Sequence, residues 1–303
     1  MAKGSRSFDA AARVFDPATR DAARHFYAWC RHCDDVIDGQ VAGHGSVASA
    51  RARAERLALL EGQTRDAMAG RPCADPAFAA LARIAVEHRL PAIVPLDILA
   101  GFRMDVEQRS YATLDDLLDY CYGVAGAVGI GMAVLLKVDP NDRETLDRAC
   151  DLGLAFQMTN IARDVMDDAR SGRVYLPAAF FGRDRVAPAF ILDSANADVV
   201  RAAALRLLDA AERYYASAWI GIARLPWRSA WAIAAALGIY RDIGQRVRRA
   251  DDPWAIRLSV PARAKLWHVA AGGVRALTVR RSARNAPQRE GLWTRPADFG
   301  LGA

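Results

Sequence analysis

Cysteine is scarce in this chain and irregularly spaced. Five cysteines are an odd number, so they do not form the paired framework of a disulfide-stabilised domain. Cys30 and Cys33 form one Cys-x-x-Cys pair, but no second pair or His-x-x-x-His motif completes a structural zinc site. We therefore expect reduced thiols that pack as small apolar groups, which favours a cytoplasmic protein.

Long hydrophobic segments are also missing. The N-terminal stretch "MAKGSRSFDAAARVF" lacks the apolar core of a secretory signal peptide. The best apolar run, Val124–Leu136, is too short and too rich in glycine for a membrane-spanning helix. We therefore expect neither a signal peptide nor a spanning helix, which leaves peripheral contact with a membrane open.

Alternating runs of β-branched residues are rare, and apolar residues recur at spacings of three and four. One such helical stripe comprises Leu205, Leu208, Ala211, Tyr215 and Trp219. With 52% apolar residues, the chain has enough material for a large core. The pattern predicts an all-α protein of roughly eight to ten helices. "DPND" at 139–142 predicts a helix that is capped by Asn141 or Asp142 and runs to about Asp168.

Lysine is nearly absent, so arginine supplies almost all of the positive charge behind the net charge of +6. Such a surplus suits anionic partners such as phosphates or an anionic membrane face. Arginines gather at 275–303, where Glu290 and Asp298 are the only acids. We expect one domain at 1–274 and then a solvated, partly disordered basic tail. The other arginines are scattered and no nucleic-acid motif occurs, so we expect no nucleic-acid partner.

Negative charge is concentrated in two places, "DDVID" at 34–38 (the first acidic motif) and "DVMDD" at 164–168 (the second acidic motif). Each motif puts two aspartates one helical turn apart on one face, where like charges destabilise a helix by roughly 0.2–0.5 kcal/mol per pair. Two solvated acidic helix ends would explain the pattern. The apolar flanks and the arginine near each motif favour instead a cation held between two facing helices.

The ligands available to such a cation are all oxygens. Hard oxygen ligands suit Mg²⁺, with Mn²⁺ as a substitute, and Mg²⁺ is typically shared between carboxylates and substrate phosphates. Arginine then has a role as a second contact for diphosphate. This arrangement permits ionisation of an allylic diphosphate, provided that a dry and partly aromatic pocket shields the carbocation.

Four ordered motifs carry a family resemblance. They are "YAWCRHCDDVIDG" (27–39), "YCYGVAGAVG" (120–129), "QMTNIARDVMDD" (157–168) and "GRVYLP" (172–177). Together they resemble the squalene/phytoene synthase family, most closely its bacterial phytoene synthases. The resemblance implies a single-domain isoprenoid synthase fold, a helical bundle around a central cavity. It also implies a prenyltransferase of carotenoid biosynthesis that joins two geranylgeranyl diphosphates head to head, through prephytoene diphosphate, to give phytoene and diphosphate without NADPH.

The resemblance also implies a set of site residues. The metal ligands would be Asp34, Asp38, Asn160, Asp164 and Asp168. The substrate-binding residues would be Ser5, Ser7, Arg31, Gln157 and Arg163. The catalytic tyrosines would be Tyr27, Tyr120, Tyr175 and Tyr240, which shape the pocket, stabilise positive charge or contact diphosphate.

Two alternatives remain open at this point. A related enzyme would condense two farnesyl diphosphates to dehydrosqualene or squalene, because the chain length depends on the cavity floor. A helical binding module without activity would be expected to have lost its acidic motifs, and all four paired aspartates are intact. Because a forty-carbon hydrocarbon product belongs in a membrane, we expect a cytoplasmic enzyme that associates peripherally with one.

Overall fold

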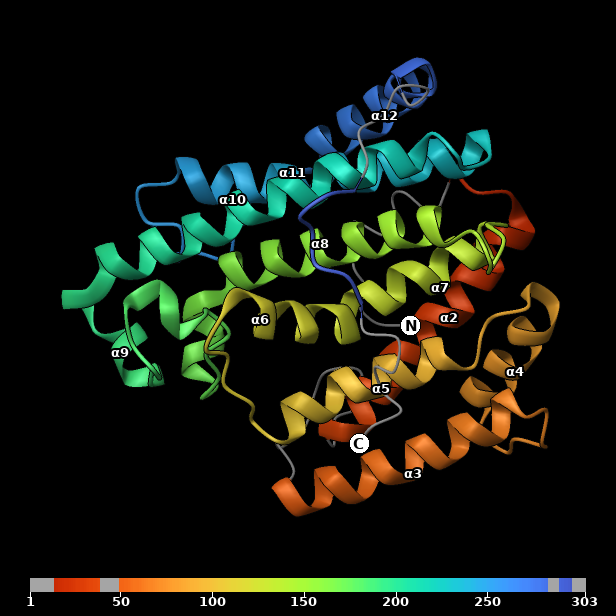
Figure 1. Cartoon of the computed structure of the whole chain (residues 1–303), viewed down its shortest axis with the longest axis horizontal. Coiled ribbons are helices and arrows are strands. Elements are labelled where there is room, and N and C mark those ends of the chain that lie inside the picture. Colours follow the sequence, from red (N-terminus) through yellow and green to blue (C-terminus); the bar gives the residue numbers. More distant parts are fainter. Residues whose placement is uncertain (1–13, 39–48, 283–288, 296–303) are drawn as a thin grey trace.

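Residues 14–38, 49–282 and 289–295 are described by the structure, a computed structural model, and every regular element in these ranges is a helix (Figure 1). The predicted all-α class is therefore confirmed. The first half contains α2 (Pro17–Asp38), α3 (Ala50–Met68), α4 (Pro76–His88), α5 (Ile93–Val106), α6 (Leu114–Cys121), the π-helical turn η1 (Tyr122–Gly126) and α7 (Ala127–Leu135). The second half contains α8 (Arg143–Arg170), η2 (Ala178–Phe181), α9 (Pro188–Leu192), η3 (Ser194–Asn196), α10 (Ala197–Ile222), α11 (Trp227–Arg249) and α12 (Ala262–Ser282).

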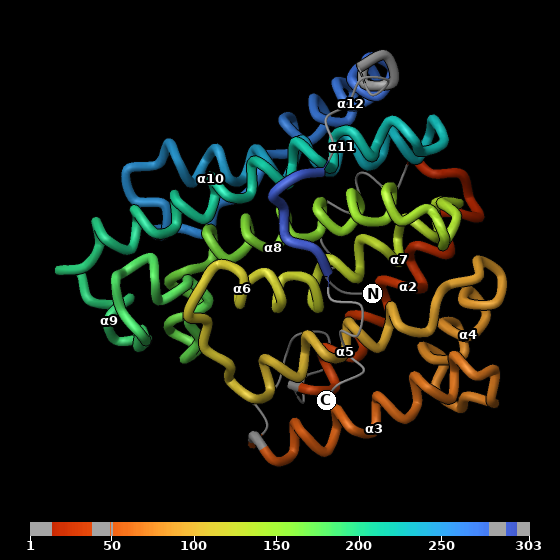
Figure 2. The backbone as a smooth tube through the Cα atoms, in the orientation of Figure 1, coloured from red at the N-terminus to blue at the C-terminus, as the bar shows by residue number. Residues whose placement is uncertain are grey.

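Helix α8 runs through the middle of the bundle. It packs against α7 and η1 on one side and against α10 and α11 on the other. Figures 1 and 2 show α3, α4 and α5 in the lower part of the view, and α12 outside α11 at the upper end. One element therefore borders both halves of the interior, and it carries the second acidic motif.

The start of α8 follows from its capping residue. The Asp142 carboxylate accepts a hydrogen bond from the backbone N–H of Thr145 at 3.1 Å, which satisfies one of the open donors at the helix start. The helix ends at Arg170, two residues beyond the expected end. The predicted helix is thus confirmed, and Gln157 to Asp168 form one rigid segment of it.

The helical run Leu114–Leu135 packs closely against its neighbours. A Cβ atom on Gly153 of α8 would lie 2.2 Å from the carbonyl oxygen of Ala125, and one on Gly123 would lie 2.5 Å from Cα of Gly101 in α5. Only glycine permits these backbone approaches. Among the described helices this run alone is long and apolar enough to cross a membrane, yet 67% of its apolar window is buried in the bundle. It is therefore a core helix of this fold.

The C-terminal part of the chain folds back onto the bundle. Helix α12 packs along α11, and residues 289–295 cross in front of α8 (Figure 2). Arg289 binds the carboxylate of Asp151 there, and the indole of Trp293 donates to Asp119. Residue 275, where we expected the tail to begin, lies within α12. The division of the chain at this residue stays a prediction.

The five cysteines are free thiols. Cys33, Cys121 and Cys150 are buried in the hydrophobic core. Burial raises the pKa of each of these thiols above its ordinary value. They pack as apolar groups, as the sequence predicted.

Candidate active site

An apolar cavity of about 350 Å³ lies between α2, α7, α8, α10 and α11. Its walls are formed mainly by aliphatic side chains and glycines, among them Val128, Met132, Leu152 and Ile233. Such a lining excludes water and suits long hydrocarbon chains. The central cavity implied by the resemblance is therefore present.

Four of the predicted site residues line one end of this cavity. They are Tyr27 on α2, Gln157 and Asn160 on α8, and Tyr240 on α11. The Asn160 amide donates to Oε1 of Gln157 at 3.4 Å, and the ring of Tyr240 stacks on that of Phe156 at 4.0 Å between centroids. We call this polar end, with the second acidic motif one turn beyond Asn160, the cavity mouth.

At the mouth, Asp164 is held by two arginines. Arg163 Nε donates to Oδ1 at 2.8 Å, and Arg257 donates to both carboxylate oxygens at 2.9 Å each. Burial raises the pKa of Asp164, but the hydrogen bonds from Arg163 and Arg257 outweigh this and hold it below its ordinary value. Asp164 is therefore a carboxylate at neutral pH, and two cations accompany it.

Asp168 has the opposite electrostatic environment. Burial and the negative charge of Asp164 raise the pKa of Asp168 to about 7, and Asp105 adds to this effect while Arg173 opposes it. Negative charge at this point is thus costly. A cation bound beside Asp168 would lower that cost.

Two of the predicted tyrosines meet at an acid that no sequence motif indicated. Tyr120 donates to Oδ2 of Asp105 at 2.9 Å, and Tyr175 donates to Oδ1 at 2.7 Å. The two rings stack at 4.9 Å between centroids. These tyrosines do not line the apolar cavity, unlike Tyr27 and Tyr240. They orient the Asp105 carboxylate beside the second acidic motif.

The first acidic motif lies at the end of α2. Arg31 reaches Asp34 at 2.7 Å and Asp35 at 2.8 Å, and the side chain of Asp35 is more buried, with 15% exposed against 42% for Asp34. Asp38 is the last residue of the helix, and its side chain lies outside the described part of the structure, as do Ser5 and Ser7. The roles of these residues stay predictions.

The metal ligands are not preassembled in the described ranges. No three His, Cys, Asp or Glu side chains there lie close enough together to hold a metal ion. Asp34, Asp35 and Asp164 instead pair with arginines, while burial and the neighbouring acids raise the pKa of Asp168. The donors are oxygens that fit Mg²⁺ or Mn²⁺.

Three residues at the mouth escaped the sequence interpretation. They are Asp105, Arg173 and Arg257. Asp105 lies in the last turn of α5, and Arg257 lies in the segment between α11 and α12, so neither belongs to an acidic motif or to a periodic pattern. Arg173 is the second residue of the "GRVYLP" motif (172–177), so its position in that motif indicates a place in the site.

Comparison with known proteins adds independent support. The family model for squalene/phytoene synthase matches residues 1–266. The chain is 47% identical to a 15-cis-phytoene synthase of Enterobacter agglomerans, over 98% of this chain and 100% of the relative. It is 48% identical to one of a Paracoccus species, over 98% of this chain and 95% of the relative.

A solved dehydrosqualene synthase in complex with a ligand superposes with a TM-score of 0.76 at 26% identity, covering 91% of this chain and 93% of the other. A squalene synthase from Alicyclobacillus acidocaldarius shares the fold with a TM-score of 0.64 at 22% identity, covering 92% and 90%. Together with the apolar cavity and its acidic mouth, these matches show that the chain belongs to the squalene/phytoene synthase family.

Proposed function

We propose that this chain condenses two geranylgeranyl diphosphates head to head, through prephytoene diphosphate, to give phytoene and diphosphate in carotenoid biosynthesis. The enzyme is accordingly a prenyltransferase. Support comes from relatives named 15-cis-phytoene synthase that are 47–48% identical over nearly the whole chain. The structural observation behind the proposal is an apolar cavity whose mouth carries carboxylates and arginines.

The side chains have separable tasks in this reaction. The apolar walls hold the prenyl chains and exclude water, which would otherwise trap a carbocation. The aromatic rings of Tyr27 and Tyr240 face the same cavity, where they stabilise positive charge. Gln157 and Asn160 orient the polar end of the substrates. Arg31 and Arg163 are the proposed diphosphate contacts.

Mg²⁺ is the proposed metal, and its ligands would be Asp34, Asp38, Asn160, Asp164 and Asp168. When bound, it neutralises charge on the leaving diphosphate. Arg163 and Arg257 fix the orientation of the Asp164 carboxylate in the meantime. A titration of the protein with Mn²⁺, followed by electron paramagnetic resonance, tests the site without a turnover assay. Equal Mn²⁺ binding by wild type and an Asp164→Asn, Asp168→Asn double variant would contradict it.

The activity is tested with purified protein and each prenyl diphosphate, with and without NADPH. We expect a forty-carbon hydrocarbon from geranylgeranyl diphosphate, without a need for NADPH and with loss of activity in excess chelator. Selective formation of a thirty-carbon product from farnesyl diphosphate would overturn the substrate assignment. Full turnover in chelator would overturn the metal assignment alone.

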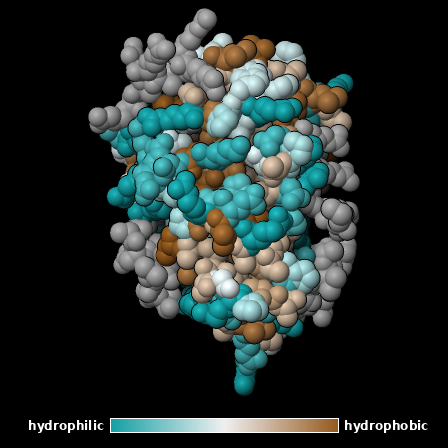
Figure 3. All heavy atoms as spheres, turned by 90° about the vertical axis from the view of Figure 1, so that its right-hand side faces the viewer, coloured by the Kyte–Doolittle hydropathy of each residue, from teal (hydrophilic) through white to brown (hydrophobic). Residues whose placement is uncertain are grey.

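We also propose that the enzyme is cytoplasmic and contacts membranes through α12. The side chains of Leu266, Trp267, Val274 and Leu277 on this helix are 58–72% exposed, and Arg263 and Lys265 lie beside them. Hydrophobic side chains reach the surface at the top of the face in Figure 3, the end at which Figure 1 places α12. An apolar face flanked by basic residues suits an anionic bilayer surface.

Co-sedimentation with vesicles tests this contact. We expect binding to vesicles that contain phosphatidylglycerol, and weaker binding for the Leu266→Ser, Trp267→Ser variant. Val86→Ser is the matched control, because Val86 is 78% exposed on α4, away from α12. Equal sedimentation of all three proteins would contradict the role of α12.

A further inference from the structure

A buried arginine borders the end of the cavity opposite the mouth. Arg148 is only 2% exposed and lines the cavity together with Leu136, Thr145 and Leu225. It precedes Asp164 by sixteen residues on α8, ~24 Å at the helical rise of 1.5 Å per residue. We call these four lining residues the cavity floor. A charged side chain is unusual in such an apolar lining, because a buried charge must be paired to be tolerated.

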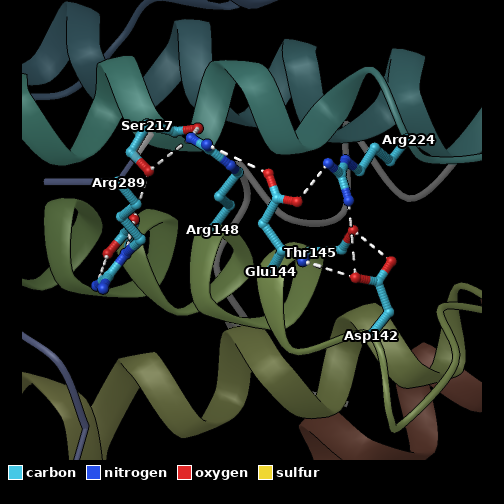
Figure 4. Close-up of polar contacts among 8 residues, drawn as sticks. Asp142, Glu144, Thr145, Arg148, Ser217, Arg224 and Arg289 are labelled. Carbon is cyan, nitrogen blue, oxygen red and sulfur yellow. Dashed lines mark hydrogen bonds and ion pairs between the residues drawn. The ribbon is translucent and has the colours of Figure 1, made fainter. Parts of the chain in front are cut away.

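The guanidinium of Arg148 is held on two sides (Figure 4). Its Nη1 donates to the Ser217 hydroxyl at 3.3 Å and to the Ser217 carbonyl oxygen at 3.4 Å. Its Nη2 donates to Oε1 of Glu144 at 3.5 Å. The other oxygen of Glu144 accepts from Arg224 at 2.5 Å. Both α8 and α10 therefore anchor this lining side chain.

The hydrogen-bond network around Arg148 extends to the C-terminal segment, residues 289–295. The Ser217 hydroxyl donates to Asp151 at 2.5 Å, and Asp151 is fully buried. Arg289 adds two hydrogen bonds to the Asp151 carboxylate, at 2.8 and 2.6 Å. The hydrogen bonds of the Arg148 Nη atoms resist displacement, because breaking them would leave a buried charge uncompensated.

The backbone around Arg148 is equally constrained. A Cβ atom on Gly221 of α10 would lie 2.8 Å from Cβ of Arg148, so the two helices meet directly at the stem of this side chain. An aliphatic side chain at the floor could rotate away from a longer ligand at little cost. An anchored guanidinium resists such a displacement, because its hydrogen bonds would be broken inside an apolar site.

We propose that Arg148 is a specificity-determining residue that sets the longest prenyl chain the cavity accepts. The floor stops a chain of twenty carbons and excludes one that is longer by a five-carbon unit. Ser217 and Glu144 are positioning residues that keep the guanidinium in place. The inference rests on the proposed function, because it assumes that the cavity holds prenyl chains with their diphosphates at the mouth.

The test compares Arg148→Ala with wild type on the twenty-carbon and twenty-five-carbon diphosphates. We expect the ratio of kcat/KM for the longer to that for the shorter substrate to rise about tenfold, the discrimination typical of added methylenes in an apolar pocket. Mass spectrometry should show the correspondingly longer hydrocarbon. Arg83→Ala is the matched control, since Arg83 on α4 is 54% exposed, pairs with Asp21 and does not line the cavity. Its ratio should equal that of wild type.

Ser217→Ala provides a second variant, in which Arg148 is retained but one anchor is lost. We expect its ratio to shift in the same direction by a smaller factor. An unchanged ratio in a folded Arg148→Ala protein overturns the inference, and if that protein does not fold, an unchanged ratio in Ser217→Ala does so.

The outcome is distinguishable from a failure of the proposed function. Wild type that condenses no prenyl diphosphate would refute the function itself. In that case, calorimetric binding of unreactive thiolodiphosphate analogues of both lengths still compares wild type with Arg148→Ala. Equal preference of the two proteins for the shorter analogue would then overturn the inference.

Discussion

The two ends of the cavity use the same chemical groups in different surroundings. At the mouth, Asp164 is paired with Arg257, whose side chain is 64% exposed. Beside the floor, Asp151 is fully buried and pairs with Arg289, whose side chain is 11% exposed. An exposed arginine can leave its partner for a substrate phosphate at little cost, whereas a buried one cannot. Exposure thus separates a binding site from a structural anchor.

The largest effect is expected on the turnover rate, when the Asp164 carboxylate is removed from the mouth. Asp164→Ala should lower kcat by about 10²–10³-fold or more, because a positioned electrostatic group at the reacting end is removed. Product formation is measured by chromatography, and helical circular dichroism should stay close to that of wild type. Asp209→Ala is the control, since this acid on α10 is 69% exposed and does not line the cavity. Near-normal turnover of Asp164→Ala would remove this carboxylate from the mechanism.

The next effect concerns the free energy of unfolding, and here the larger loss is expected beside the floor rather than at the mouth. Asp151→Asn should lower the free energy of unfolding by about 3–5 kcal/mol, because Arg289 loses the partner of a buried ion pair. Asp164→Asn should lower it by less, because solvent screens Arg257, which is 64% exposed, although the second partner Arg163 is only 12% exposed. Urea denaturation followed by circular dichroism measures both. Equal losses for the two variants would contradict the distinction drawn from burial.

A third acid sharpens the comparison, because it is buried and no arginine bonds to it directly. Asp97 is 2% exposed; Tyr122 donates to its Oδ2, and its Oδ1 has no hydrogen-bond partner among the described residues. Burial raises the pKa of Asp97 to about 7, against the opposing effects of Tyr122 and Arg295. The folded protein therefore holds the proton of Asp97 more tightly than the unfolded chain does. The resulting stabilisation is fully present below about pH 4 and is lost as the pH rises to about 7.

Asp97→Asn removes that titration. The variant should gain on the order of 1–2 kcal/mol over wild type between pH 5 and pH 8, because it no longer has to ionise in a buried site. Thermal unfolding across this range measures the gain. A difference between the two proteins that does not change with pH would show that Asp97 keeps an ordinary pKa.

The smallest stability effect is expected at the first acidic motif. Arg31 pairs with Asp34 at 2.7 Å, but the side chains are 44% and 42% exposed. Arg31→Met should therefore change the free energy of unfolding by about 1 kcal/mol or less. If Arg31 contacts diphosphate, KM should rise in the same variant. An unchanged KM with unchanged stability would leave Arg31 outside the site.

Local sequence patterns predicted much of the fold. The cap at Asp142 and the apolar periodicity gave α8 nearly to its ends, because both signals act within a few residues. The spacing of Asp164 and Asp168 likewise placed two carboxylates on one helix face.

The site was predicted less completely, and the reason is distance along the chain. Tyr120 and Tyr175 were expected in the active site, but their shared partner Asp105 lies on α5. Arg257 reaches Asp164 from 93 residues away. Neither contact has a local pattern, since it depends on how separate helices pack.

The sequence by itself determined the helical class, the family and the two acidic motifs, because short-range spacing and composition carry that information. Only the tertiary structure decided which arginines are exposed enough to exchange a carboxylate for a substrate phosphate and which are buried in fixed ion pairs. Arg148 shows this most clearly: in the sequence it is one arginine among many, while in the bundle it lines an apolar cavity. Burial between α8 and α10 makes the difference, because the strength of a charged contact depends on the solvent that packing removes.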